Sequence, residues 1–242
     1  MSSLQLVVVA ASVFTAAFVQ VLSGFGFALL CVPLMTLAVP TKEAVVISTL
    51  MGAGVSSWQA WHGRQHTERT AVLRMVPAAY LGMPLGLWVY LSADDQVLRV
   101  LLGIAVLAAV VLLAARIDLR HTGPGLDVGA GFISGVLNTS LSTNGPPLVF
   151  ALQARHLQPD VFRSTINTVF AFCNVLGVTL FVAAGKVTGD GLRAALVALP
   201  ALAAGQLAGY PLRRHVDGER FRVLVLVLLT AAALSAILSA VR

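Results

Sequence analysis

The sequence predicts an all-α polytopic membrane protein of two homologous halves, each opened by a broken or re-entrant helix. Of its 242 residues, 58% are hydrophobic and 11% are charged, whereas about 25% are charged in a soluble domain. Charge-free stretches recur along the chain, most of them near or above the roughly 20 apolar residues that a membrane helix needs. These stretches are residues 4–41, 44–63, 75–93, 100–115, 128–154, 164–185, 194–212 and 223–241.

The few charges and cysteines exclude several other classes. A net charge of +6 does not indicate nucleic-acid binding, because basic residues in short loops between membrane helices are the expected positive-inside signal. Cys31 and Cys173 both lie in charge-free stretches, which favours packing residues over a disulfide or a metal pair. No basic region precedes the first apolar run, so we expect a retained helix and not a cleaved signal peptide.

An internal repeat divides the chain in two. A displacement of 114 residues aligns Phe18, Pro33 and Leu34 with Phe132, Pro147 and Leu148. A displacement of 116 aligns Ser48-Thr49 with Ser164-Thr165, and one of 123 aligns Pro77, Gly82 and Gly86 with Pro200, Gly205 and Gly209. The preserved order predicts halves at 1–118 and 119–242, a construction that is common in transporters.

In the first half we expect a broken segment at 4–39 and helices at about 43–61, 72–93 and 97–115. A straight helix over 4–39 would be about 54 Å long, far longer than the hydrocarbon core of about 30 Å. Its middle holds Ser23-Gly24-Phe25-Gly26, where glycine is a poor helix former. We expect the chain to break there, with Pro33 as a further structural break.

In the second half we expect a broken segment at 126–152 and helices at about 162–184, 191–211 and 221–241. The broken segment contains Asn-Thr-Ser-Leu-Ser-Thr-Asn-Gly-Pro-Pro over 138–147, and Pro146 and Pro147 cannot continue a helix from the preceding turn. A break at membrane depth is tolerated where it faces protein or a watery cavity, and matched breaks point to a transporter's binding site. The alternative is that these small and hydroxyl residues only let helices pack closely.

Two membrane arrangements fit the broken segments. If each segment crosses the membrane once, the 16 basic residues divide equally, with eight on each side. If each returns to its own side as a hairpin, eleven basic residues, Arg74 and Arg155 among them, face one side and five face the other. Unequal division is usual in membrane proteins, so we expect an inverted repeat of five helical segments per half, with both termini outside.

The motifs Ser-Gly-Phe-Gly-Phe-Ala-Leu-Leu-Cys-Val-Pro-Leu over 23–34 and Gly-Phe-Ile-Ser-Gly-Val-Leu-Asn-Thr-Ser-Leu-Ser-Thr-Asn-Gly-Pro-Pro over 131–147 carry a family resemblance. Together with the small duplicated halves, they resemble the sulfite exporter TauE/SafE family, also called the toluene sulfonate uptake permeases, over essentially the whole chain. The resemblance implies transport of sulfite, sulfonates or related sulfur-containing anions across a bacterial inner membrane. One departure is that 27–30 and 142–144 lack the denser glycine cluster of many members, which leaves the particular substrate open.

The residues themselves favour an anion site made of dipoles. No Lys or Arg lies near the middle of a charge-free stretch, so half-helices starting near Gly26 and near Asn144–Pro146 would present their N–H groups and positive dipole ends. The candidate binding residues are Ser23, Gly24, Phe25, Gly26, Asn138, Thr139, Ser142, Thr143, Asn144, Gly145, Asn167 and Asn174. We expect Gln20 and Gln206 to bridge helices, and His62 and His66 to lie in a solvated loop.

These observations predict a multi-pass transporter of small sulfur-containing anions, with an anion channel or a carrier of another small solute as alternatives. An enzyme would need a nucleophile with a base, a carboxylate pair or a metal cluster in the apolar stretches, and we find none of these in the sequence. We expect no cofactor and no metal. The expected partners are the small anionic substrate and the lipid bilayer, with a homo-oligomer as a further possibility.

Overall fold

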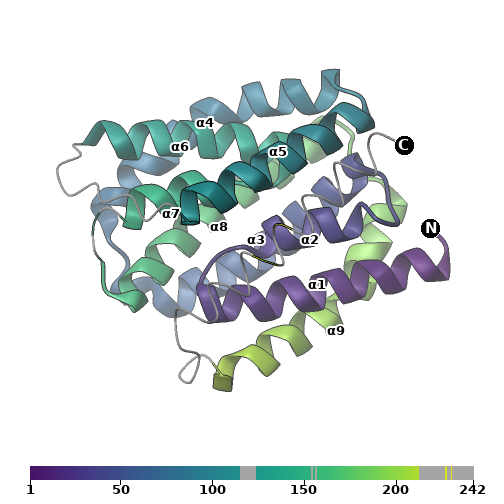
Figure 1. The fold of residues 1–242 in the computed structure, drawn as a ribbon, viewed down its shortest axis with the longest axis horizontal. Helices are drawn as coiled ribbons and strands as arrows, with labels where there is room; N and C mark the ends of the chain where they lie inside the picture. Colours follow the sequence, from purple (N-terminus) through teal and green to yellow (C-terminus); the bar gives the residue numbers. More distant parts are fainter. Residues whose placement is uncertain (115–123, 154, 156, 213–226, 228–229, 231–242) are drawn as a thin grey trace.

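The computed structural model describes residues 1–114, 124–153, 155, 157–212, 227 and 230 (Figure 1). The described regular elements are α1 (Ser3–Ser23), α2 (Phe27–Met35), α3 (Thr41–Gly63), a short 3-10 turn η1 (Arg64–His66), α4 (Arg69–Ser92), α5 (Asp95–Ala114), α6 (Pro124–Leu141), α7 (Gly145–Gln153), α8 (Pro159–Ala183) and α9 (Gly189–Leu212). Five of these, α1, α4, α5, α8 and α9, contain a stretch long and apolar enough to cross a membrane. The all-helical membrane class is therefore confirmed. The predicted helix at 221–241 and the boundary between the halves fall outside the described residues.

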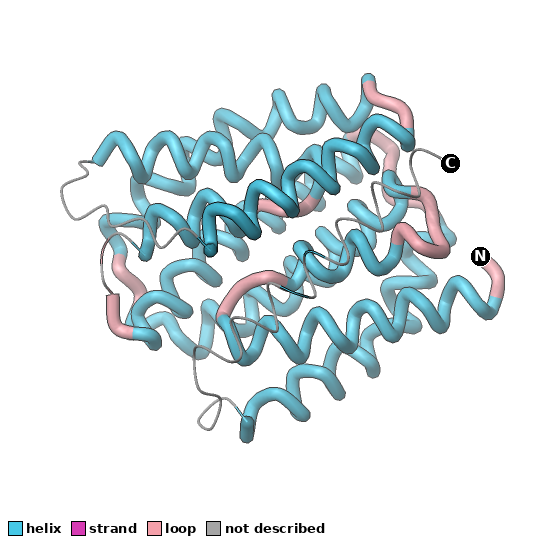
Figure 2. Tube along the Cα trace, viewed as in Figure 1, coloured by secondary structure: helices cyan, strands magenta, loops and turns pink. Residues whose placement is uncertain are grey.

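Both long apolar segments are interrupted within their predicted ranges, and Figure 2 shows the breaks as short loops. The first follows α1, where Gly24 (φ 85°) and Gly26 (φ 93°) adopt left-handed conformations that glycine reaches without strain. The second follows α6, where Ser142 takes φ 59° although it carries a side chain. A serine in this region is uncommon, which identifies the second break as the more constrained of the two.

Pro33 does not mark a break, so that part of the prediction is wrong. The helix α2 contains Pro33 and continues to Met35. Proline removes its own N–H bond to the carbonyl four residues earlier and crowds that carbonyl, yet here the chain stays helical through Pro33 and the helix ends shortly afterwards. Pro146 and Pro147 stand instead in the first turn of α7, directly after the break, where a missing N–H costs little.

Each broken segment returns toward its own starting end. Gln5 Nε2, near the start of α1, donates a 2.9 Å hydrogen bond to the carbonyl of Ala38, which follows α2. Arg155, which follows α7, forms an ion pair with Asp127 at the start of α6, and Arg74 lies 3.4 Å from the same carboxylate. Sharing one carboxylate places Arg74 and Arg155 at the same end of the molecule. This is the geometry expected of hairpins, and the inverted repeat itself remains a prediction.

The helices pack in pairs around a central core. In Figure 1, α4 and α6 run together along one edge and α1 and α9 along the other, while α3 and α8 pack against each other between them. Glycines permit these close approaches: a side chain on Gly82 or Gly86 would collide with the backbone of α6, and one on Gly205 would lie 2.5 Å from the carbonyl of Phe14 in α1. Glycines at positions aligned by the proposed repeat thus have the same packing role.

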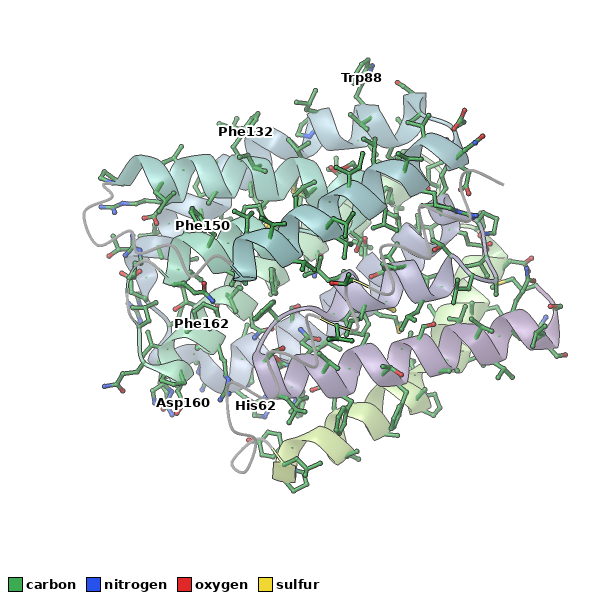
Figure 3. All side chains as sticks on the ribbon, in the orientation of Figure 1. His62, Trp88, Phe132, Phe150, Asp160 and Phe162 are labelled. Carbon is green, nitrogen blue, oxygen red and sulfur yellow. The ribbon has the colours of Figure 1, made fainter. Side chains whose placement is uncertain are left out.

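Burial is distributed as expected for a protein surrounded by lipid. Large apolar side chains face outward, such as Leu81 and Trp88, which are 75% and 64% exposed. Trp88 and Phe132 point away from the body in Figure 3. Polar side chains gather in the interior instead, among them Thr49, Asn138 and Asn167. The outer surface is therefore suited to acyl chains, and the polar interior contains the candidate site.

Candidate functional site

The two breaks meet at one buried cavity in the middle of the protein. Its volume is about 20 Å³, which is room for about one water molecule. It lies beside Gly52, in the middle of α3, and Asn174 of α8. The remaining lining residues are Gln20, Gly26, Phe27, Ala28, Leu29, Ser48, Ser56, Ser142, Thr143, Asn144, Gly145 and Phe170. We call this space the inner cavity.

The N-terminus of α2 supplies backbone donors to the inner cavity. Gly26 caps this helix without any side-chain hydrogen bond, and the first bond at the helix start runs from Leu30 N to Gly26 O at 3.2 Å. The N–H groups of Phe27, Ala28 and Leu29 therefore have no partner within the helix, and all three residues line the cavity. Such a helix end favours negative charge.

The second break offers side-chain donors more than backbone donors. Two of the first residues of α7 are prolines without N–H groups, so Gly145 and Leu148 are the only backbone donors of its first turn. Thr143 Oγ1 and Asn144 Nδ2 lie beside them, buried and without a hydrogen-bond partner in the described structure. Buried polar atoms are nearly always paired, so these two side chains are well suited to hold a ligand.

Hydroxyl groups of α3 and of the second break form a hydrogen-bonded cluster at one wall of the inner cavity, which Ser48 and Ser142 line. Thr49 Oγ1 lies 3.1 Å from Ser142 Oγ, and Ser142 Oγ donates to Ser48 Oγ over 3.3 Å. The strained backbone of Ser142 thereby brings its hydroxyl to the middle of α3. The serine-threonine pair that the repeat analysis found at 48–49 thus contacts the second break.

A larger cavity of about 510 Å³ lies on the other side of Gln20 and Asn167. Its lining includes Gly24, His62 and Arg163, together with the exposed side chains of Trp58 and Tyr210, so it is open to the surface. Figure 3 shows His62 at the same end of the molecule as Asp160, another lining residue. We call this cavity the vestibule.

A hydrogen-bonded amide pair separates the vestibule from the inner cavity. Gln20 Nε2, on the inner-cavity side, donates to Asn167 Oδ1 over 3.4 Å. Asn167 Nδ2 donates in turn to the carbonyls of Gly24 at 3.1 Å and Arg163 at 2.8 Å. The long Gln20 contact is the weakest of the three, so it is the one that separates most readily.

The described residues include no group of three or more His, Cys, Asp or Glu that could hold a metal ion. The described residues that line the inner cavity also include no charged side chain. The family model for the sulfite exporter TauE/SafE family matches residues 9–236. The chain belongs to the sulfite exporter TauE/SafE family. TauE/SafE proteins are transporters, so this protein is a membrane transporter and not an enzyme. Searches of the curated proteins and of the solved structures found no match.

The TauE/SafE transporter brings together six of the twelve predicted binding residues at the inner cavity. These are Gly26, Ser142, Thr143, Asn144, Gly145 and Asn174. Gly24 and Asn167 line the vestibule.

Four predicted residues have mainly structural contacts. Thr139 Oγ1 donates to the carbonyl of Met83 at 2.6 Å, which ties α6 to α4. Asn138 Nδ2 donates to Asn174 Oδ1 at 2.8 Å. Ser23 Oγ bonds the backbone of its own turn, and Phe25 lies within that turn. None of the four lines either cavity.

Sequence reasoning missed two charged residues of this transporter. In the sequence analysis, Arg163 was considered only as one of the basic loop residues. In the structure its side chain lies against Gly24, because a Cβ added to Gly24 would be 2.5 Å from Arg163 Cγ. Its position four residues before Asn167 was the available signal, because residues four apart share a helix face. Asp127 is 2% exposed and joins the ion pairs at the base of α6.

Proposed function

We propose that this transporter carries a small sulfur-containing anion, such as sulfite or a sulfonate, across the bacterial inner membrane, and binds it in the inner cavity. The observation that carries the proposal is the meeting of unpartnered donors there. Thr143 and Asn144, whose Oγ1 and Nδ2 atoms are unpartnered, line this cavity together with the residues at the start of α2. An oxyanion with several acceptor oxygens would satisfy all of them at once.

The charge of the transported solute is inferred from the residues that line the inner cavity. No carboxylate, cysteine or methionine is found among the described residues that line the inner cavity, so the carboxylate and sulfur ligands that commonly hold metal cations are missing there. The helix dipole of α2 favours an anion. Neutral donors bind an anion weakly enough for release, as a carrier requires. Together, the donors and the helix dipole support a small anion over a cation as the transported solute.

The size of the inner cavity supports a carrier over a channel. A volume of about 20 Å³ holds roughly one water molecule, which is too little for an anion of four heavy atoms. If the anion binds here, the walls of the inner cavity must therefore separate during transport. We propose that the vestibule is the entry route, and that the Gln20–Asn167 pair opens to admit the anion.

We also propose the inverted-repeat arrangement for this transporter. The returning hairpins and the shared contact of Arg74 and Arg155 with Asp127 support it. The basic end, with both arginines, would face the cytoplasm. Cysteine labelling from either side of the membrane, at positions near 64 and 155, tests this arrangement: both should react from the same side.

The test of function is anion flux in proteoliposomes. We would compare sulfite and an alkyl sulfonate with sulfate, chloride and glutamate, in wild type and in Thr143→Val and Asn144→Leu. Thr143→Val keeps the shape and removes the hydroxyl. Its matched control is Thr179→Val, which removes an exposed hydroxyl that bonds only its own helix. Size-exclusion profile and melting temperature establish that each variant is folded.

We expect saturable sulfite or sulfonate flux in wild type and in Thr179→Val, and strongly reduced flux in the two cavity variants. Flux that never saturates would replace the carrier with a channel. Folded wild-type protein that moved none of these anions would overturn the proposal, and neutral solutes and cations would then be tested. Normal flux in both cavity variants would place the binding site elsewhere.

A further inference from the structure

A third cavity, of about 550 Å³, lies on the outer surface between α3, α4 and α8. It is a groove and not part of the path formed by the vestibule and the inner cavity, with which it shares no lining residue. Two of its walls carry prominent apolar side chains: Trp61 of α3 is 66% exposed and Leu73 of α4 is 73% exposed.

One end of the groove is basic. Arg64 and Arg69 stand on the short turn between α3 and α4, with Thr67 between them. The Arg64 guanidinium lies over the ring of Trp61, 4.3 Å from its centroid, and Nη1 donates to the Trp61 carbonyl at 3.4 Å. These two contacts orient Arg64 along the rim. Tryptophan beside arginine is typical of the level of lipid headgroups.

Among the described residues that line the groove there is no Asp or Glu to offset these charges. Glu68, which precedes Arg69 in the sequence, is already engaged: its Oε2 accepts from the N–H of Ala71 at 2.8 Å and from Arg155 at 3.1 Å. The positive potential of the arginines is therefore directed to the outside of the protein.

The other end of the groove is apolar and continues along the helix axes. On α8, Thr168, Phe172 and Val175 share one face of the helix. Seven residues separate Thr168 from Val175, which corresponds to a depth of about 10 Å along the helix. Phe172 and Val175 are about half exposed. The groove thus has a cationic head and a hydrocarbon-like body.

We infer that this groove binds one anionic phospholipid, with its phosphate between Arg64 and Arg69 and one acyl chain along the apolar body. The basic end and the apolar body of the groove follow each other in the same order as the headgroup and the acyl chain of a lipid. The volume and the depth are those of part of one acyl chain. This inference rests on the membrane location of the protein and not on the identity of the transported anion.

The test is native mass spectrometry of the full chain in detergent, with phosphatidylglycerol and phosphatidylcholine of identical acyl chains. The variant R64Q/R69Q removes both charges of the groove. Its matched control K186Q/R193Q removes two exposed charges elsewhere. A third variant, Ala171→Trp, fills the apolar body and leaves the arginines in place. Binding of inorganic phosphate is measured in parallel, to distinguish a lipid site from a simple anion site.

Wild type should retain one phosphatidylglycerol in preference to phosphatidylcholine. Each arginine near an anionic headgroup raises the affinity about fivefold. The affinity of R64Q/R69Q for phosphatidylglycerol should therefore fall about 25-fold, and its affinity for phosphatidylcholine should change little. The control should behave as wild type, and Ala171→Trp should lose both lipids. Equal retention of the two lipids by wild type, an unchanged preference in R64Q/R69Q, or equally tight binding of inorganic phosphate would each overturn the inference.

Discussion

Asn138 Nδ2 donates a 2.8 Å hydrogen bond to Asn174 Oδ1, and this bond ties the helix that precedes the second break to the middle of α8. Both side chains are buried, at 0% and 6% exposure. Asn174 also lines the inner cavity. The contact therefore couples the position of the second break to the position of a cavity wall.

Loss of this bond should lower stability. In Asn174→Ala, the buried Asn138 amide would lose its acceptor, and a buried donor without a partner costs about 1–3 kcal/mol. We expect a lower melting temperature of the purified protein, followed by tryptophan fluorescence. Thr179→Ala, at an exposed position on the same helix, is the control and should melt like wild type. Identical melting of all three proteins would contradict the role assigned to the bond.

The Gln20–Asn167 pair should control access from the vestibule. In Asn167→Ala, Gln20 loses its partner and the partition between the two cavities loses a side chain. We expect a cysteine introduced by Ser142→Cys to react several times faster with a small thiol reagent in the Asn167→Ala background. The native Cys31 and Cys173 are buried, and wild type measures their residual reaction. Equal rates in both backgrounds would show that the pair is no barrier.

Gly26 and Gly185 provide a matched pair for the first break. Both have positive φ, of 93° and 64°, and an added Cβ would meet nothing within 4 Å at either. Alanine at each should therefore cost a similar amount, about 1–2 kcal/mol of backbone strain. We expect only Gly26→Ala to reduce anion flux, because only this strain is placed at the N-terminus of α2. Equal flux in the two variants would argue against α2 as a binding element.

Gly86 and Gly54 test the close packing of α4 on α6. A Cβ on Gly86 would collide with the Val136 carbonyl and the Thr139 hydroxyl, whereas one on Gly54 would meet nothing within 4 Å. We expect Gly86→Ala to lower the yield of monodisperse protein and its melting temperature. Gly54→Ala should be neutral or slightly stabilising, because alanine restricts the unfolded chain. Size-exclusion chromatography with a thermal melt compares them, and a well-folded Gly86→Ala would refute the packing argument.

The helices and the positions of both breaks could be predicted because their causes are local. Charge-free stretches of sufficient length indicate membrane helices, and glycine or paired proline interrupts them wherever they pack. The predicted ends of the helices at 43–61 and 162–184 differ from α3 and α8 by one to three residues. The prediction for Pro33 was wrong because the chain stays helical through this proline and α2 ends only at Met35.

The composition of the site could be predicted only in part, because it depends on how distant helices pack. Asn138 and Thr139 stand one turn before Ser142 and Thr143 and are chemically alike, yet they face α8 and α4 instead of the inner cavity. Sequence alone does not show which face of α6 meets which neighbour. Arg163 was missed for the same reason, since its contact with Gly24 joins segments that are 139 residues apart (163 − 24).

The two hairpins are fastened at their bases by different chemistry, and this has a consequence for the transport cycle. The α1–α2 hairpin is closed by one neutral bond from Gln5, whereas the α6–α7 hairpin is closed by ion pairs to the buried Asp127. A neutral hydrogen bond contributes about 1 kcal/mol. Charge-assisted contacts to a buried carboxylate are stronger, although the Arg155 side chain is itself 25% exposed. At its base the first hairpin is therefore held less strongly than the second. If one hairpin moves during transport while the other stays in place, we expect α1–α2 to be the one that moves, so that the two hairpins would contribute unequally to the transport cycle.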